Sequence, residues 1–233
     1  MAPPRHPDRP KLVVVIAAAG RGGRFGSDKM SERIGRRTVL ETAVSALREA
    51  IPTAPMVVVV ASEKLEEWRA ILESDSPVTV VIAGGERRQD SVRIGVEAAA
   101  DSGADVVAIH DGARPSIHPD DVERVMDSLG DADAVILAAP IRDTVKRINA
   151  DGVIVETIDR DALRLAQTPQ VFRVAALRDA WERQDPASEW SDEAAMVEAD
   201  GGVVRSVLAD HPNPKITTTA DLEIIRAMIG GGS

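Results

Sequence analysis

Residues 12–29 read LVVVIAAAGRGGRFGSDK, and this stretch decides the fold that we expect for the chain. The apolar run from Leu12 to Ala17 has no polar break, which is typical of a parallel strand buried on both faces of a sheet. Four glycines follow: Gly20, Gly22, Gly23 and Gly26. Without a Cβ they let backbone amides approach a bound group closely. A loop of this kind at the carboxyl end of a central strand is where open α/β sheets bind phosphorylated ligands.

Cationic side chains accompany these glycines. Arg21, Arg24 and Lys29 add positive charge to a loop whose N–H groups already point outward, and that combination favours a triphosphate over a neutral ligand. The loop lacks the Gly-x-x-x-x-Gly-Lys-Ser/Thr motif, and Phe25 stands where a dinucleotide fingerprint has its third glycine. The alternative interpretation is an ordinary connection between a strand and a helix.

The composition of the chain limits its class. With 233 residues and 44% hydrophobic content it can form one large domain, which we place at 11–233 after a disordered tail at 1–10. It has no cysteine and no apolar run as long as a membrane span. Its four histidines lack the spacing of a zinc site. We therefore expect a cytoplasmic protein without disulfides, zinc or a membrane partner. The net charge of -10 argues against binding of nucleic acid, so the loop arginines indicate either a local positive site or ordinary surface charges.

Strand and helix patterns alternate downstream of this loop. Strands are expected at 56–60, 78–82, 105–109 and 134–139, and helices at 39–50, 62–74, 90–100 and 119–129. Thr38 and Glu41 form a capping-box pattern, and we expect Ser62 and Asp90 to cap the next two helices. The alternation predicts an α/β, Rossmann-like, mostly parallel sheet with helices on both faces.

Two further loops end strands of this sheet. The stretch from Ala83 to Gln89, AGGERRQ, again combines glycine with arginine, and it indicates either a second loop for a phosphate or a base, or a plain glycine turn. The stretch HDGARP follows strand 105–109 and brings Asp111, a carboxylate that suits Mg²⁺, since this ion prefers one or two carboxylates plus substrate phosphates. Arg114 can then bind a phosphate. The alternative role for Asp111 is to cap the turn that follows.

The alternation breaks at 141–160. Residues 144–148 and 153–158 flank a short linker that ends at Gly152, and they predict a protruding β-hairpin arm. A two-stranded ribbon is only marginally stable alone, so we expect this arm to pack against a second copy of the chain and make a dimer. Segment 163–172 returns to the body of the molecule, and 203–208 is expected as a last strand. Helices are expected through 181, from 191 and over 219–229.

Eight motifs occur along the chain in the order AAAGRGGRFG, GGERRQDSV, HDGARP, APIRDTVKR, DR at 159–160, QTPQVF, SDEA and NPKIT. In order and spacing they resemble the 2-C-methyl-D-erythritol 4-phosphate cytidylyltransferases of the non-mevalonate isoprenoid pathway, within the nucleotidyltransferase superfamily. The resemblance covers residues 11–229. It implies that CTP and 2-C-methyl-D-erythritol 4-phosphate give 4-CDP-2-C-methyl-D-erythritol and pyrophosphate, with Mg²⁺ as cofactor and a homodimer as the assembly.

The resemblance also implies roles for individual residues. The nucleotide would contact Ala18, Ala19, Gly20, Gly85, Ser91, Asp111 and Gly112. The sugar phosphate would contact Arg114, Thr144, Thr168 and Ser191, and Thr144 and Arg160 would reach it from the partner's hairpin. The catalytic residues, which position the phosphates and stabilise their charge, would be Arg24, Lys29, Arg160 and Lys215. Asp111 would contact the metal, which otherwise binds through the substrate phosphates.

Three positions depart from the family pattern. Asp28 stands before Lys29 where the family commonly has proline, Ser191 replaces threonine, and Gly112 replaces alanine. Two rival functions stay open, a cytidylyltransferase that forms CDP-ribitol and a nonenzymatic nucleotide-binding protein of the same fold. The motifs HDGARP and PIRDTVKR favour the erythritol enzyme over the ribitol enzyme.

Overall fold

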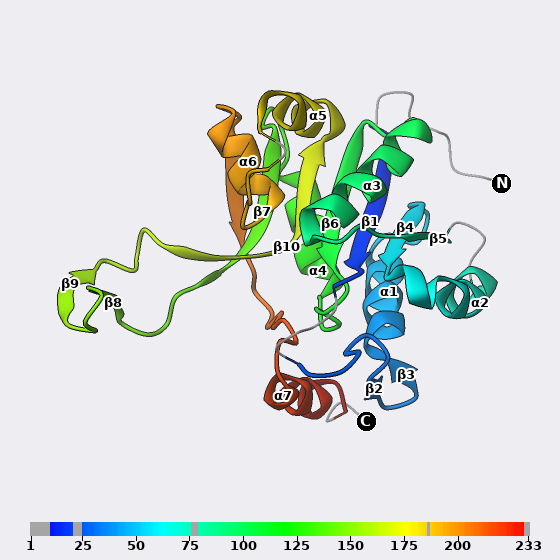
Figure 1. Cartoon of the computed structure of the whole chain (residues 1–233), viewed down its shortest axis with the longest axis horizontal. Helices are drawn as coiled ribbons and strands as arrows, with labels where there is room; N and C mark the ends of the chain where they lie inside the picture. The colour runs from blue at the N-terminus through cyan, green and yellow to red at the C-terminus, as the bar shows by residue number, and fades with distance from the viewer. Residues whose placement is uncertain (1–9, 21–24, 76–78, 186, 231–233) are drawn as a thin grey trace.

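The computed structural model describes residues 10–20, 25–75, 79–185 and 187–230. At its centre is a seven-stranded sheet in the order β11-β7-β10-β6-β1-β4-β5 (Figure 1). Its strands are β1 (Leu12–Ala18), β4 (Met56–Val60), β5 (Thr79–Ala83), β6 (Val106–Asp111), β7 (Ala134–Pro140), β10 (Arg164–Arg173) and β11 (Val204–Leu208). β10 runs antiparallel to both neighbours and the other pairs are parallel. The predicted α/β fold with a mostly parallel sheet is therefore confirmed.

Helices cover both faces of the sheet (Figure 1). They are α1 (Val39–Ala50), α2 (Leu65–Asp75), α3 (Arg88–Asp101), α4 (Pro119–Asp127), α5 (Val174–Arg183), α6 (Glu193–Ala199) and α7 (Thr219–Gly230). Alternate residues of β1 point to opposite layers, since Val14 and Ile16 join the core beneath α1, α2 and α4, whereas Val13 and Val15 join the core beneath α3, α5 and α6. β1 is thus buried on both faces, as its unbroken apolar run predicted. Among the described residues, no helix combines the length and apolar character needed to cross a bilayer.

Local sequence predicted the start of α1 but not that of α2. The capping box is present at α1, because the Glu41 N–H donates to Thr38 Oγ1 at 3.2 Å and the Thr38 N–H donates to Glu41 Oε2 at 2.7 Å. The prediction that Ser62 caps a helix is wrong. Ser62–Lys64 form a 3₁₀ turn without a side-chain cap, and α2 begins only after it.

Two other local features differ from the prediction. Asp90 does not cap α3, because the helix already begins at Arg88 and Asp90 lies in its first turn, where its carboxylate accepts the N–H of Arg87 at 3.2 Å. A small antiparallel pair, β2 (Arg33–Ile34) and β3 (Arg37–Thr38), lies between the loop after β1 and α1, where no strand was predicted. Strands of two residues are too short to show a period in the sequence.

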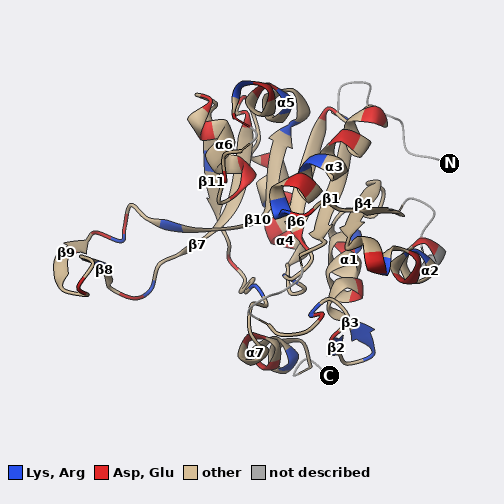
Figure 2. Ribbon diagram, viewed as in Figure 1, with Lys and Arg blue, Asp and Glu red and all other residues tan. Residues whose placement is uncertain are grey.

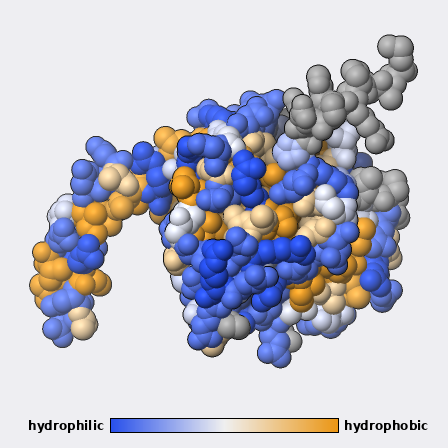
Figure 3. All heavy atoms as spheres, turned by 90° about the horizontal axis from the view of Figure 1, so that it is seen from above, coloured by the Kyte–Doolittle hydropathy of each residue, from blue (hydrophilic) through white to orange (hydrophobic). Residues whose placement is uncertain are grey.

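The hairpin arm consists of β8 (Val145–Ile148) and β9 (Ile154–Ile158), which pair antiparallel and extend away from the body of the molecule (Figure 1). Large apolar side chains on the arm and at its base are 54–60% exposed, namely Ile148, Val153, Ile154, Val155 and Leu165. Figure 3 shows this apolar surface as orange spheres along the arm. The predicted protruding arm is confirmed, and its exposed apolar surface is of the kind that marks an interaction site.

The predicted tail at 1–10 lies outside the described residues except for Pro10. Basic and acidic side chains are interspersed over the helices, with Asp and Glu prominent on α2 and α6 (Figure 2). The chain carries a net charge of -10, so a cluster of cations on it indicates a site that binds anions.

Candidate functional site

The carboxyl ends of β1 and β6 lie side by side, with Ala17 paired to Asp111. The chain passes from β1 to β4 on one side and later reaches β6 on the other side, so the strand order reverses at β1. Such a reversal leaves a crevice beyond the strand ends. A pocket lies there, and its lining includes Ala19, Gly20, Lys29, Ser91, Asp111 and Lys215. The structure therefore brings together six residues that the sequence had suggested for the site.

Asp111 lies at the bottom of this pocket among cations. Its Oδ2 is 2.7 Å from the Lys215 ammonium and 3.7 Å from Arg114 Nε, and its Oδ1 is 3.4 Å from Arg88 Nε. Burial opposes the charged form, but the attraction of Arg88 and Lys215 outweighs burial and holds the pKa of Asp111 below its usual range. Asp111 is therefore an ionised carboxylate at neutral pH.

A chain of hydrogen bonds fixes the backbone of this strand end. The Asp111 N–H donates to Thr168 Oγ1 at 3.0 Å, Thr168 Oγ1 is 3.2 Å from His110 Nδ1, and His110 Nε2 is 3.0 Å from the carbonyl oxygen of Arg114. Burial lowers the pKa of His110 to about 4, so the imidazole is neutral at pH 7. Since a carbonyl can only accept, Nε2 carries the proton and Nδ1 accepts from the Thr168 hydroxyl. The chain thus runs from Asp111 to Thr168 to His110 to Arg114.

Lys29 and Lys215 come from opposite ends of the sequence and line the same pocket. The Lys29 ammonium donates to the carbonyl oxygen of Ile216, the residue after Lys215, at 3.0 Å. Asp28 stabilises the turn that carries Lys29, because its carboxylate accepts the Met30 N–H at 3.1 Å and the Ser31 hydroxyl at 2.6 Å. Lys29 therefore reaches the pocket without the proline that is common in the family.

The loop after β5 contacts Ser91, which lines the pocket, but Gly84 and the predicted residue Gly85 do not line it themselves. The Gly85 N–H donates to Ser91 Oγ at 3.1 Å, which joins the loop to the first turn of α3. A Cβ built on Gly84 would lie 2.5 Å from Ala19 Cβ and 2.6 Å from Ser91 Oγ. The loop after β5 and the loop after β1 therefore touch at a position that only glycine fits.

Four predicted residues, Ala18, Gly112, Arg114 and Thr168, are buried and do not line the pocket. Ala18 is buried, and the Gly112 N–H donates to the Ala17 carbonyl oxygen at 3.0 Å. Arg114 is also buried, and its Nη1 donates to the carbonyl oxygen of Asn213 at 2.7 Å. The Asn213 side-chain amide donates in turn to the Thr168 carbonyl oxygen at 2.8 Å. Arg114 and Thr168 are thus held by protein groups close to Asp111.

Other predicted residues are not brought to the pocket within one chain. Thr144 and Arg160 are exposed at the base of the arm, next to the pair Val145–Ile158, and the Arg160 guanidinium donates to the Arg142 carbonyl oxygen. Ser191 is exposed two residues before α6 and does not line this pocket. Arg24 lies outside the described residues.

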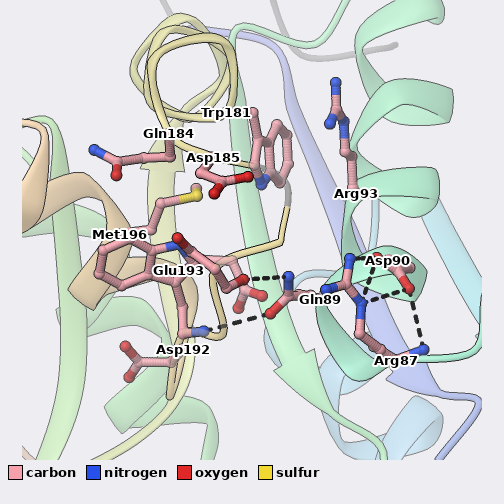
Figure 4. A pocket seen from close by; sticks show the side chains of 12 residues that line it. Arg87, Gln89, Asp90, Arg93, Trp181, Gln184, Asp185, Asp192, Glu193 and Met196 are labelled. Carbon is pink, nitrogen blue, oxygen red and sulfur yellow. Dashed lines mark hydrogen bonds and ion pairs between the residues drawn. The ribbon is translucent and has the colours of Figure 1, made fainter.

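A second hollow adjoins the first, between α3, α5 and the segment before α6 (Figure 4). Trp181, Trp190 and Gln89 line it. The side-chain amide nitrogen of Gln89 donates to the Ser188 carbonyl oxygen at 3.0 Å, and its side-chain oxygen accepts the backbone N–H of Trp190 at 3.4 Å. Glu193 lines this hollow as well, and both of its oxygens are 2.9 Å from Arg88 Nη1. Arg88 lines the first pocket, so the Arg88–Glu193 pair separates the two.

Sequence reasoning missed Arg88 and Glu193. Both lie inside quoted motifs, GGERRQDSV and SDEA, but nothing local shows that they contact each other across 105 positions of the chain. Two histidines were likewise not expected to meet. His118 and His211 stack with ring centroids 3.6 Å apart and an angle of 11° between the planes, close to Asp120. An ion in the plane of one ring would lie outside the plane of the other, so this cluster does not present converging lone pairs to a metal.

A doubly wound sheet, a glycine loop beyond its central strand and a carboxylate surrounded by cations define a nucleotide-binding α/β protein. The comparisons with known proteins narrow this class. The sequence model of the family "2-C-methyl-D-erythritol 4-phosphate cytidylyltransferase" matches residues 12–230.

Similar proteins carry this name or that of a bifunctional enzyme. The cytidylyltransferase of Rhodococcus jostii is 36% identical over 225 residues, which are 95% of this chain and 96% of that protein. The crystal structure of the enzyme from Thermus thermophilus superposes on this chain with a TM-score of 0.75, and the two sequences are 31% identical. The match covers 94% of this chain and 98% of that chain. The bifunctional IspD/IspF enzyme of Rhodospirillum rubrum is 38% identical over 95% of this chain, and the chain spans 58% of that longer protein.

The chain belongs to the 2-C-methyl-D-erythritol 4-phosphate cytidylyltransferase family, and it is an enzyme of the nucleotidyltransferase class. The resemblance carried by the eight motifs and the activity that it implied are confirmed. The roles of single residues, the metal and the assembly do not follow from membership alone.

Proposed function

We propose that the pocket beyond β1 and β6 is the active site, where CTP and 2-C-methyl-D-erythritol 4-phosphate react to give 4-CDP-2-C-methyl-D-erythritol and pyrophosphate. One observation carries this proposal: Lys29 and Lys215 meet beside the ionised Asp111 at the end of the central strand. The reaction brings two anionic substrates together, so it requires a concentrated positive site. The pocket supplies such a site on a chain with a net charge of -10.

The phosphate of the sugar is the nucleophile. Its second pKa is about 6, so it is mostly dianionic at pH 7 and needs no general base. One of its oxygens bonds to the α-phosphorus of CTP, the bond from that phosphorus to the bridging oxygen breaks, and pyrophosphate leaves with the electron pair. The protein is left with positioning the phosphates and stabilising their charge.

Lys29 and Lys215 have this task in our proposal. A lysine ammonium has three hydrogens, so Lys215 can hold Asp111 at 2.7 Å and still donate to a phosphate oxygen. Lys29 is fixed by the Ile216 carbonyl oxygen in the same way. We assign Arg24 to the triphosphate as well, on the basis of the family motif, although it lies outside the described residues.

Asp111 is the residue that would hold Mg²⁺. It is the single carboxylate among the described residues that line the pocket, and its charge is secured by its low pKa. One carboxylate plus substrate phosphates is a usual set of Mg²⁺ ligands, so the residues present fit the ion. When bound, Mg²⁺ would neutralise charge on the phosphates.

The two substrates are assigned to opposite sides of Asp111. Ala19, Gly20 and Ser91 line the pocket and would face CTP, together with Gly85, which is joined to Ser91 by its hydrogen bond. We assign Ala18 and Gly112 to the same substrate through their backbones. The sugar phosphate would lie toward Arg114, Thr168 and Ser191.

We also propose a homodimer in which the arm of each chain reaches the partner's site. The support is the exposed apolar surface of the arm, and the position of Thr144 and Arg160 at its base, outside the lining of their own chain's pocket. Reciprocal exchange of arms produces twofold symmetry. The cytoplasmic location and the absence of membrane and nucleic-acid partners stay predictions from composition.

The test is the rate of pyrophosphate release by the purified protein with Mg²⁺. We expect turnover with CTP and 2-C-methyl-D-erythritol 4-phosphate, and little with ATP, GTP or UTP. Faster turnover with D-ribitol 5-phosphate would identify the rival cytidylyltransferase. Binding of CTP without turnover on either acceptor would indicate a nonenzymatic protein.

A further inference from the structure

Arg88 lies between two buried carboxylates. Its Nη1 is 2.9 Å from both oxygens of Glu193, and its Nε is 3.4 Å from Asp111 Oδ1. The Glu193 and Asp111 side chains are 3% and 9% exposed, and Arg88 is 32% exposed. A planar guanidinium can donate along two edges at once, which lets a single side chain serve both carboxylates.

The two oxygens of Asp111 have different partners. Arg88 faces Oδ1, whereas Oδ2 faces Lys215 at 2.7 Å and Arg114 Nε at 3.7 Å. The rotation of the carboxylate about its last side-chain bond is therefore fixed from both sides. If Arg88 were absent, Asp111 could turn, and the place where Lys215 is held would change with it.

Glu193 in turn fixes Arg88. Arg88 is the first residue of α3, Glu193 is the first residue of α6, and Asp111 is the last residue of β6, so the contacts join the ends of three elements. The neighbouring residue Gln89 binds the backbone before α6 at Ser188, which holds the same two helix ends together (Figure 4). One edge of the Arg88 guanidinium is thus fixed by Glu193, and its Nε faces Asp111 in the pocket.

We propose that Arg88, held by Glu193, is a positioning residue that orients the Asp111 carboxylate and thereby places Lys215 for the phosphates. This inference rests on the proposed function of the pocket. The alternative is a purely structural role, in which Arg88 only neutralises the charge of the buried Glu193.

A double variant separates the two roles. Arg88→Met alone leaves Glu193 buried without its cation, so its melting temperature should fall under either role. Arg88→Met combined with Glu193→Gln removes both charges and should restore most of that loss. If Arg88 only neutralises Glu193, activity returns as well. If Arg88 positions Asp111, kcat stays lower by about 100-fold, the cost of a displacement near 1 Å at a reacting centre, while KM changes little.

The matched control is the Arg178–Glu97 pair, which also joins α3 to a neighbouring helix but is far more exposed. Arg178→Met with Glu97→Gln should leave kcat unchanged. Arg88→Lys keeps the charge but loses the planar fork, and we expect a fall in kcat of about tenfold that tests the idea even if the double variant does not fold. A kcat within threefold of the wild type in the folded double variant, or a fully active Arg88→Lys enzyme, would overturn the proposal.

A readout without substrate distinguishes this inference from the proposed function. In a crystal structure of the double variant we expect the Asp111 carboxylate to be rotated and its contact with Lys215 lost. An unchanged Asp111–Lys215 contact would overturn the positioning role whatever the activity. Failure of the wild-type enzyme to release pyrophosphate would instead refute the proposed function and leave the structural readout intact.

Discussion

Gly84 offers the sharpest test of how the pocket is built. A Cβ at this position would lie 2.5 Å from Ala19 Cβ and 2.6 Å from Ser91 Oγ. Carbon atoms in contact are normally about 3.5–4.0 Å apart, so Gly84→Ala requires a separation of the two loops by about 1 Å. Ala19 Cβ and Ser91 Cβ, the latter 3.1 Å away, are fixed to the backbone, and the Ser91 hydroxyl can rotate away only if it gives up its hydrogen bond to the Gly85 N–H.

The size of the effect follows from that displacement. Overpacking of this kind costs about 1–3 kcal/mol, including the bond of about 1 kcal/mol from the Gly85 N–H to Ser91 Oγ if it breaks. For a domain of this size that corresponds to a fall in Tm of roughly 2–12 °C. A shift near 1 Å of Ala19 and Ser91, which line the pocket, should lower kcat/KM by about 100-fold.

Gly112→Ala is the matched control. A Cβ there would lie 3.1 Å from Leu40 Cδ1 and 3.2 Å from Ala18 Cβ, a shortfall of a few tenths of an ångström that the end of Leu40 can absorb. We expect this variant to stay within about threefold of the wild-type kcat/KM, with a cost below about 1 kcal/mol. The assays are pyrophosphate release and thermal unfolding. Wild-type values for both in Gly84→Ala would refute the contact between the loops.

Three further expectations concern single groups. Lys215→Ala should fold and lose roughly 10²–10³-fold in kcat, the effect of removing one donor to transition-state charge, whereas Lys64→Ala at the surface should be fully active in the same pyrophosphate assay. Burial lowers the pKa of His110 from 6.5 to about 4, so the stability that the neutral imidazole contributes is complete above pH 6.5 and is lost as the pH falls toward 4. In denaturant unfolding, the free energy of unfolding should therefore fall by about 2 kcal/mol between pH 7 and pH 5. This fall should be absent in His110→Asn. Mixing inactive Arg160→Ala and Lys215→Ala chains should restore up to roughly half the activity per mixed dimer, and no recovery after verified exchange of subunits would place Arg160 outside the partner's site.

Much of the fold could be predicted because its signals are local. The unbroken apolar run of β1 requires burial on both faces, and the Thr38 capping box marks where α1 begins. The errors at Ser62 and Asp90 have one cause. Both residues are good caps, but the chain enters α2 through a 3₁₀ turn and enters α3 earlier than the sequence suggests, and tertiary packing rather than the capping residue decides the boundary.

The site could be predicted in part for a related reason. Glycines and charged residues at strand ends pointed to the loops that form the pocket, and Lys29 reaches it despite the altered residue before it. The Arg88–Glu193 contact could not be predicted, since it joins two helix ends that only the complete sheet brings together. The role of Arg160 cannot be read from one chain at all, because the arm leads away from its own pocket.

A crystal structure with Mg²⁺ and a nonhydrolysable CTP analogue would show whether the pocket binds the nucleotide. We expect the triphosphate between Lys29 and Lys215 beside Asp111, with the cytosine against Gly85 and Ser91. A nucleotide bound instead in the neighbouring hollow lined by the two tryptophans, or bound without contact to either lysine, would contradict this expectation.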